Sequence, residues 1–202
     1  MTRSHTRLAL LTLAALLTLA AVAPATAAAK TYRLGTGTAT FSLDQTETGV
    51  FLHAGVPPYP IFPSRISWTT TSATLRMPIT GGRWTTGTSA HGTFLLGGGL
   101  VYADPDSTTP FDILDLTRWH AGVNTSAGIS VLANGTRTPN FYDEKGPVSS
   151  IVTIHGHKYA KVELGALFYN ATSVGALGLA IGSSPANPGD PFGSVTFLAR
   201  LK

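Results

Sequence analysis

The sequence predicts an all-β domain, a sandwich or barrel of about eight to ten strands with one short helix in its C-terminal half. Runs of β-branched and aromatic residues recur at intervals of roughly 8–12 residues, which is typical of sandwiches and barrels. Asn134-Gly135, between two such runs, is a signal for a two-residue hairpin turn. A single segment, Val174–Ile181, has the small apolar residues of a helix, and Asn170 or Thr172 can cap it.

The expected strands alternate apolar residues with Thr and other polar residues, the pattern of a half-buried strand. In chain order they are Tyr32–Leu43, Ile66–Met77, Phe94–Ala103, Phe111–Leu116, Ile129–Leu132, Val148–Ile154, Tyr159–Leu164 and Phe192–Leu201. Gly81-Gly82 and Gly97-Gly98-Gly99 punctuate this pattern. Gly55–Pro63 is predicted to be a proline-rich loop or edge, and Ser183–Pro191 a second loop.

The first 27 residues are predicted to be a secretory signal peptide. Arg3 and Arg7 make a positive start, and the apolar run Leu8–Ala23, about 16 residues, is short for a membrane-spanning anchor, which is the alternative. Ala25-Thr26-Ala27 is a small-x-small cleavage signal, and Ala27-Ala28-Ala29 is a second one. We therefore expect residues 28–202 to form a single domain, secreted or associated with the cell wall, with no membrane span left after cleavage. N-terminal sequencing of the mature protein tests this.

Composition narrows the class of protein. The sequence has no cysteine, which excludes disulfides and a lipidated cysteine anchor. Arg3 and Arg7 account for two of the four formal positive charges, so the domain after cleavage is close to +2. Because the sequence has no run of Lys or Arg, we do not expect nucleic acid as a partner.

Several segments resemble one known family. Gly92-Thr93-Phe94 followed by Gly97-Gly98-Gly99-Leu100 is similar to the glycine-rich signature of haem-transport-associated (HtaA-like) domains of exported actinobacterial proteins. Further segments that resemble this family are Leu43-Asp44, Ala54-Gly55-Val56, Phe111–Leu116, Ile154–Leu164 and Asn170–Gly182. The resemblance spans most of residues 28–202 and implies an exported all-β domain with a small helix.

The same resemblance implies a difference in the ligand site. Haem-binding members have a His just before the paired glycines, and here Leu96 occupies that position. An aliphatic side chain cannot ligate haem iron, which needs a donor such as His or Tyr. His91 and Tyr102 are the nearest substitutes, but neither has the right position along an extended strand. We therefore expect no cofactor, with haem disfavoured.

Two other patterns raise the question of a metal. His155-Gly156-His157 puts two imidazoles at alternate positions, with Glu163 nearby, but the flanking alternation favours a tight turn with the histidines in water. The acidic residues and threonine at Asp104, Asp106, Thr108, Asp112 and Asp115 partly match a calcium loop. Thr109 stands where that loop requires glycine, so an ordinary turn is favoured.

Evidence for catalysis in the sequence is weak. Ser89, in Gly87-Thr88-Ser89-Ala90-His91, lacks the second glycine and the strand–turn–helix context of a nucleophile elbow. No pair of carboxylates stands out from the acidic residues of turns, which argues mildly against a glycosidase. A hydrolase whose site assembles only in three dimensions stays open as an alternative.

Aromatic residues are the best candidates for binding. Trp68, Trp84 and Trp119, together with Tyr59, Tyr102 and Tyr142, can form a face for a sugar, lipid or protein, or can fill the core. We take Trp84, Trp119 and His91 as candidate binding residues. The favoured function is an exported, non-enzymatic β module that binds a small ligand, a protein or a cell-surface component. A haem or metal carrier and an extracellular hydrolase are the alternatives.

Overall fold

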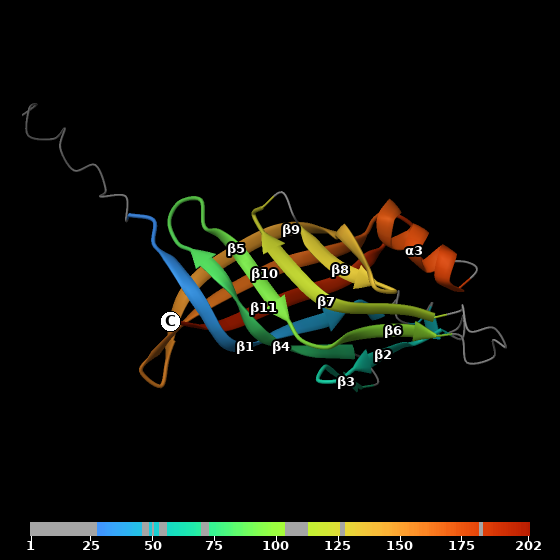
Figure 1. Ribbon diagram of the computed structural model, residues 1–202, viewed down its shortest axis with the longest axis horizontal. Helices are drawn as coiled ribbons and strands as arrows, with labels where there is room; N and C mark the ends of the chain where they lie inside the picture. Colours follow the sequence, from blue (N-terminus) through green and yellow to red (C-terminus); the bar gives the residue numbers. More distant parts are fainter. Residues whose placement is uncertain are drawn as a thin grey trace, which may run out of the picture.

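The structure is a computed structural model that describes residues 28–45, 49, 51–52, 56–69, 73–103, 113–125, 128–181 and 184–202. The described chain forms eleven strands and the helix α3, Ala171–Ile181 (Figure 1). The strands are β1 (Thr31–Leu43), β2 (Pro58–Ile61), β3 (Arg65–Trp68), β4 (Ala73–Thr85), β5 (His91–Leu96), β6 (Gly99–Ala103), β7 (Ile113–Val123), β8 (Ile129–Ala133), β9 (Thr136–Ile154), β10 (His157–Tyr169) and β11 (Pro191–Leu201). The predicted signal peptide, residues 1–27, lies outside the described residues.

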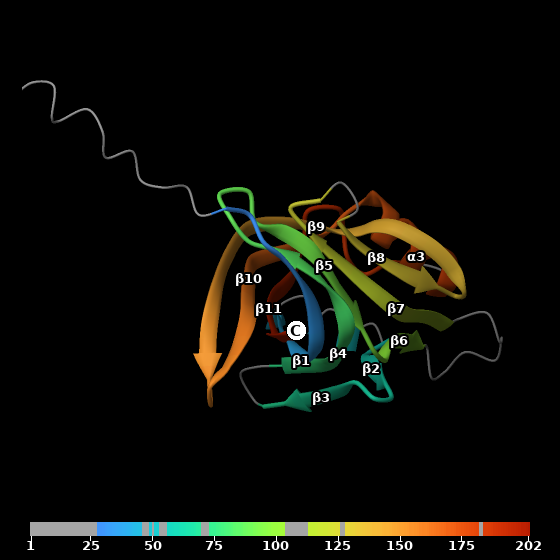
Figure 2. The ribbon, with the colours of Figure 1, turned by 60° about the vertical axis from the view of Figure 1, so that its left-hand side comes forward.

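Eight of the strands close into an antiparallel barrel, in the order β7-β5-β4-β1-β11-β10-β9-β8, and β8 pairs back with β7. Outside this ring, β3 pairs with β4, β6 with β7 and β2 with β6. We call β2, β3 and the turn that joins them the β2–β3 flap; Figure 2 shows it below the barrel. The all-β prediction is confirmed, with the barrel rather than the sandwich and with a short helix.

Two predicted strands were too long. Ile66–Met77 belongs to two strands, β3 and β4, which pair with each other so that Arg65 lies opposite Arg76. Phe94–Ala103 divides at Gly97-Gly98 into β5 and β6, both of which pair with β7. The break has a local cause: the Gly97 amide still donates to the Pro78 carbonyl at 2.8 Å, in the register of the β4–β5 ladder, but the next residue, Gly98, leaves the extended conformation with a φ of 80°.

The predicted hairpin signals are confirmed. Asn134 and Gly135 have φ values of 47° and 79° and join β8 to β9. His155 and Gly156, with φ values of 48° and 77°, join β9 to β10, and Ile154 lies opposite His157. Positive φ at both central residues is the geometry of a type I′ turn, whose twist matches the flanking strands.

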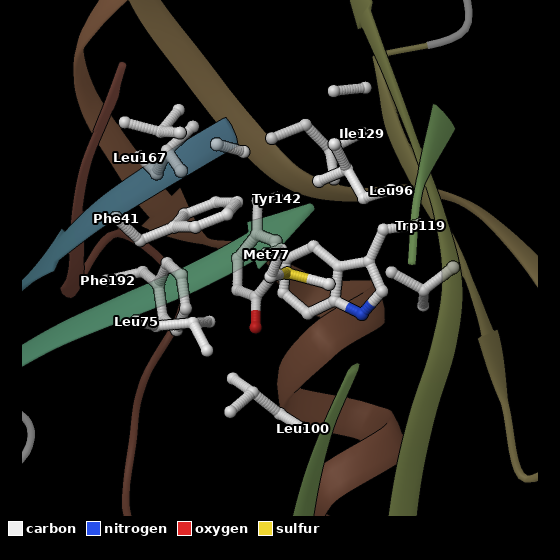
Figure 3. Close-up of a cluster of buried hydrophobic side chains, with 14 of the residues drawn as sticks. Phe41, Leu75, Met77, Leu96, Leu100, Trp119, Ile129, Tyr142, Leu167 and Phe192 are labelled. Carbon is white, nitrogen blue, oxygen red and sulfur yellow. The ribbon is translucent and has the colours of Figure 1, made fainter. Parts of the chain in front are cut away.

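Apolar side chains fill the barrel because alternate residues of every strand point inward. Phe41, Met77, Trp119 and Tyr142 meet in the interior (Figure 3). The Trp119 ring lies 5.5 Å from the Phe41 ring and 5.8 Å from the Tyr142 ring, centroid to centroid. Within the described residues, no helix has the length and apolar composition to span a bilayer.

The helix begins where the sequence predicts. The Asn170 side-chain oxygen accepts from the amides of Thr172 at 2.9 Å and Ser173 at 3.1 Å, and the Ser173 hydroxyl accepts from the Asn170 amide at 2.8 Å. The Asn170 amide group also donates to the Asn140 carbonyl at 2.7 Å, which ties the helix to β9. Asn170 therefore caps the helix and anchors it to the barrel.

We expect Asn170→Ala to lower the free energy of unfolding by about 1–2 kcal/mol, because it removes the cap and leaves two helix amides without their acceptor. Chemical denaturation followed by fluorescence measures this loss. Thr172→Ala, two residues further on, serves as the control, because the Thr172 backbone amide can still donate to the Asn170 side chain. Equal stability of Asn170→Ala and the native protein would contradict the assignment.

Candidate binding surface

Basic side chains that are far apart in the sequence gather on the outer face of the barrel. In the β1–β4 ladder Arg33 lies directly opposite Arg83, and in the β3–β4 ladder Arg65 lies directly opposite Arg76. All four side chains are exposed, on the face opposite the barrel core. Directly opposite residues place their Cβ atoms about 5 Å apart, and like charges at that separation destabilise a sheet. The barrel thus carries two cross-strand arginine pairs on one strand, β4.

Arg200, near the end of β11, and Lys202, which follows that strand, extend this surface. The Lys202 amide donates to the Arg33 carbonyl at 2.9 Å, so Lys202 is the next basic residue across the sheet from Arg33. The Lys202 side chain lies over Gly35, where a Cβ would come within 2.9 Å of its Cε. Arg200 donates through Nη2 to His157 Nδ1 at 3.0 Å. We call Arg65, Arg76, Arg83, Arg33, Arg200 and Lys202 the basic band.

Acidic residues lie elsewhere in the described barrel. Asp44 follows the end of β1 that is opposite Arg33, and Asp190 precedes the end of β11 that is opposite Lys202. Among the described residues the ion pair is between Lys161 and Glu163, at 2.7 Å, both on β10. The basic band therefore meets no carboxylate from the described residues, and its charge faces solvent.

Exposed aromatic side chains lie beside one end of the basic band. Phe62, 87% exposed, is in the turn that precedes Arg65. Trp68, 45% exposed, is on the same short strand as Arg65 but on its other face, because it lies opposite the buried Ala73. Tyr59 is exposed on β2. The β2–β3 flap thus combines one arginine, Arg65, with uncovered aromatic rings, the residue types that dominate binding hot spots.

The predicted binding residues Trp84 and Trp119 lie elsewhere. They are 1% and 0% exposed, respectively, and both belong to the barrel core. Trp84 packs 5.8 Å from Phe94, and the Trp119 indole donates to the Leu116 carbonyl at 2.9 Å. Both occupy strand positions whose side chains point into the barrel, Trp84 on β4 and Trp119 on β7. They therefore fill the core, which was the alternative to a binding face, and so do Tyr102 and Tyr142. Only Trp68 and Tyr59 of the predicted aromatic face are exposed.

The third predicted binding residue, His91, is exposed at the start of β5. Its Nδ1 hydrogen-bonds the Ser89 carbonyl at 2.7 Å, which holds the ring against the 86–90 turn. It lines a cavity of about 320 Å³ together with Ala28, Ala29 and residues 85–89. This cavity is apart from the β2–β3 flap, because His91 pairs with Thr85 at the other end of β4.

The histidine pair forms the predicted tight turn rather than a chelating strand face. His155 is a turn residue and His157 is the first residue of β10, hydrogen-bonded to Arg200. Among the described residues, no three His, Asp or Glu side chains group as a metal site. Most of the calcium-like loop, residues 104–112, lies outside the described residues. Asp115 is on β7, and burial raises the pKa of its carboxyl.

A serine, a histidine and an arginine lie together on β7, β8 and β9, which bears on the hydrolase alternative. Arg137 donates through Nη2 to His120 Nδ1 at 3.3 Å and to the Ser130 hydroxyl at 3.3 Å. Burial, and then the Arg137 charge, lower the pKa of His120. A serine hydrolase needs a carboxylate behind its imidazole to stabilise the imidazolium. Here a guanidinium occupies that place, which is the opposite electrostatic arrangement.

The substitutes proposed for a haem ligand are far apart. Gly92, next to His91, pairs with Val123, whereas Tyr102 pairs with Leu114, nine residues away on β7. Nine residues of strand span about 30 Å. Tyr102 is in the core with its ring 5.1 Å from Phe51, and burial raises its pKa to about 12. Leu96 is likewise buried in the barrel.

We expect haemin added to the purified protein to bind weakly or not at all. Tyr102 would ligate iron as the deprotonated phenolate, but its buried site raises the pKa and so favours the protonated phenol. An absorbance titration measures this. A saturable one-to-one Soret shift that is lost in Tyr102→Phe or His91→Ala would overturn the expectation and name the ligand.

A buried carboxyl makes the stability depend on pH. Burial raises the pKa of Glu144, on β9, and the Asn124 backbone amide, which donates to it, opposes the shift. Its Oε2 is buried without a partner among the described residues. Because the folded protein holds this proton to higher pH than the unfolded chain, stability from this group falls as pH rises above the unfolded pKa of about 4.3.

We therefore expect Glu144→Gln to raise the melting temperature at pH 7 and to leave it unchanged below about pH 4, where both states are protonated. Thermal unfolding across this pH range checks the sign. Glu163→Gln removes an exposed carboxyl and should change the melting temperature little at any pH. A Glu144→Gln gain that persists at low pH would point to packing instead of charge.

Comparison with known proteins adds one similarity. No protein-family model and no curated protein sequence matches the chain. Among solved structures, the crystal structure of haem-binding protein HtaB from Corynebacterium glutamicum is similar, with a TM-score of 0.46 and 12% identity. The alignment covers 86% of this chain and 97% of that chain. A similarity of this degree decides neither the family nor the ligand, so both questions rest on the residues described above.

Proposed function

We propose that this protein is an exported, non-enzymatic β-barrel module that binds an acidic polysaccharide of the cell surface through the basic band and the β2–β3 flap. The observation that carries the proposal is the register of β4, which places Arg83 opposite Arg33 on β1 and Arg76 opposite Arg65 on β3. Each pair costs stability in the free protein, and an external oxyanion between the two guanidinium groups removes that cost.

The spacing of the charges favours a polymer over a small anion. Arg83 and Arg33 lie on the neighbouring strands β4 and β1, and Lys202 directly follows β11, the next strand across; neighbouring strands are about 4.8 Å apart. Arg76 and Arg83 are seven residues apart on β4, or about 23 Å. A chain with repeated negative charges can contact several of these residues at once, and each neutralised charge adds to affinity through release of counterions.

The residue types favour a sugar polymer with acidic groups. Five of the six residues in the basic band are arginines, whose planar fork matches a carboxylate or phosphate oxygen pair. Tyr59, exposed on β2, and Phe62, in the turn before Arg65, offer flat apolar rings to the faces of sugars. That nucleic acid is not a partner stays a prediction. The lack of a run of Lys or Arg in the sequence does not support it for this surface, because the basic band is assembled from residues that are distant in the sequence.

Binding of polygalacturonate, measured by titration calorimetry at several salt concentrations, tests the proposal. We expect Arg33→Gln with Arg83→Gln to weaken binding about tenfold or more at low salt and to flatten the salt dependence by about two charges. Arg118→Gln with Lys145→Gln removes the same charge elsewhere on the exposed surface and should keep most of the affinity.

Three further measurements complete the test. Tyr59→Ala should weaken polygalacturonate binding while keeping its salt dependence, because it removes a ring contact and no charge. Neutral dextran should not bind. Equal losses in the two charge-removal variants, or a single-stranded oligonucleotide that binds more tightly than polygalacturonate at the same salt, would overturn the proposal.

A further inference from the structure

Among the described strands, β9 has no partner along most of one edge. β8 pairs with β9 only as far as Tyr142, whereas β10 pairs with it to Ile154 at the hairpin turn. From Pro147 to Ile154, no strand among the described residues pairs with the other edge. An open strand edge presents a row of free amides and carbonyls that can pair with another strand.

The register tells which backbone groups face this edge. Ile154 and His157 close a two-residue type I′ turn, so they form a hydrogen-bonded pair, and the pairs alternate from there along the ladder. The amides and carbonyls of Ser149, Ile151 and Thr153 therefore point away from β10, toward the open edge. The backbone nitrogen of Pro147 also points toward the open edge, so the amide hydrogen that proline lacks is not needed for the ladder to β10.

This edge lacks the usual protection against pairing. Residues 146–154 contain no charged side chain, although charges on an edge strand are a common barrier to association. Val148 is 63% exposed on one face of the strand, and Ile151 is 41% exposed on the other. The edge therefore offers apolar side chains on both faces beside its free backbone groups.

We propose that two copies of this protein form a dimer by antiparallel pairing of their β9 edges about a two-fold axis at Ile151. In this register Ile151 of one copy lies opposite Ile151 of the other, and Ser149 lies opposite Thr153. These three hydrogen-bonded pairs supply six backbone hydrogen bonds. Val148 then lies opposite Ile154, so apolar side chains meet on both faces of the new ladder.

The self-complementary register is what favours a second copy over an unrelated strand. Every apolar side chain on the edge finds an apolar or uncharged partner, and no like charges meet within residues 147–153. Pro147 falls outside the hydrogen-bonded pairs, so its missing amide costs nothing. The two-fold axis is perpendicular to the sheet at β9, so the outer faces of the two β9 strands lie on the same side.

Sedimentation equilibrium of the purified protein tests the dimer. We expect a dimer that becomes a monomer in Ile151→Pro, which removes an edge-facing amide without touching the ladder to β10, and in Ile151→Lys, which places like charges at the axis. Leu179→Lys changes a side chain that is 91% exposed on α3 and should leave the dimer intact. Circular dichroism confirms that each variant keeps its strands.

Amide exchange followed by NMR supplies a second readout. We expect the amides of Ser149, Ile151 and Thr153 to become protected as protein concentration rises, while those of Ser150 and Val152, which face β10, are protected at all concentrations. A native protein that is monomeric at about 100 µM would overturn the proposal. So would a dimer that survives both Ile151 substitutions.

Discussion

Trp119→Ala is expected to lower the free energy of unfolding by about 3–5 kcal/mol. The Trp119 side chain is fully buried at the centre of the barrel, against Phe41 and Tyr142. The strands around it are closed into a ring by backbone ladders, so they can move little to fill the space that the indole leaves. The substitution also leaves the Leu116 carbonyl without its indole donor.

Trp68→Ala is the matched control for this loss. Trp68 loses the same atoms, but its ring is about half exposed on the β2–β3 flap, so we expect less than about 1 kcal/mol. Urea denaturation of both variants, followed by circular dichroism, gives the two free energies. Similar losses in the two variants would contradict the assignment of Trp119 to the core and Trp68 to the surface.

Features of the fold that depend on neighbouring residues were predictable from the sequence. Asn134-Gly135 and His155-Gly156 were expected to be turns, and either Asn170 or Thr172 was expected to cap the helix, which Asn170 does. In each case the conformation is set within a few residues. Strand alternation also located most strands. It could not show that Ile66–Met77 is a hairpin, because both arms of a short hairpin carry the same alternating pattern.

The candidate site depends on pairing between distant strands, which the sequence does not show. Arg33 and Arg83 are fifty residues apart, and they meet only because β1 and β4 pair in one register. A shift of that register by one residue would turn one side chain toward the core. Charge counting along the sequence therefore missed the basic band, and residue type alone could not separate Trp119 in the core from Trp68 on the surface.

The glycine cluster shows how a local signal can have a non-local cause. The sequence marks Gly97-Gly98-Gly99 as an interruption between strands. In the structure, Gly98 lies against the turn of the β2–β3 flap, where the Ser64 hydroxyl accepts from the Gly99 amide at 2.9 Å. Ser64 is itself buried, and its amide donates to the Ile61 carbonyl at 2.9 Å. The glycines therefore let the flap dock where β5 ends and β6 begins.

Gly98→Ala is expected to lower the free energy of unfolding by about 2–5 kcal/mol, for two separable reasons. First, Gly98 has a φ of 80°, a left-handed conformation that residues with a side chain rarely adopt. Second, the Cβ of alanine would lie 2.1 Å from the Ser64 hydroxyl oxygen. The Ile61 carbonyl at 2.6 Å and the Ser64 amide nitrogen at 2.7 Å are also too close. Because these last two are backbone atoms, rotation of the Ser64 side chain cannot relieve the clash.

Gly135→Ala separates backbone strain from the clash. Gly135 has nearly the same φ, 79°, but a Cβ there would meet nothing within 4 Å. We therefore expect Gly135→Ala to cost about 1 kcal/mol, which is the strain of the left-handed conformation alone. Denaturation of both variants gives the difference, which measures how tightly the flap is docked. If the two losses are equal, the flap moves away at little cost, and the aromatic and arginine side chains that it carries are not held in a fixed arrangement beside β4.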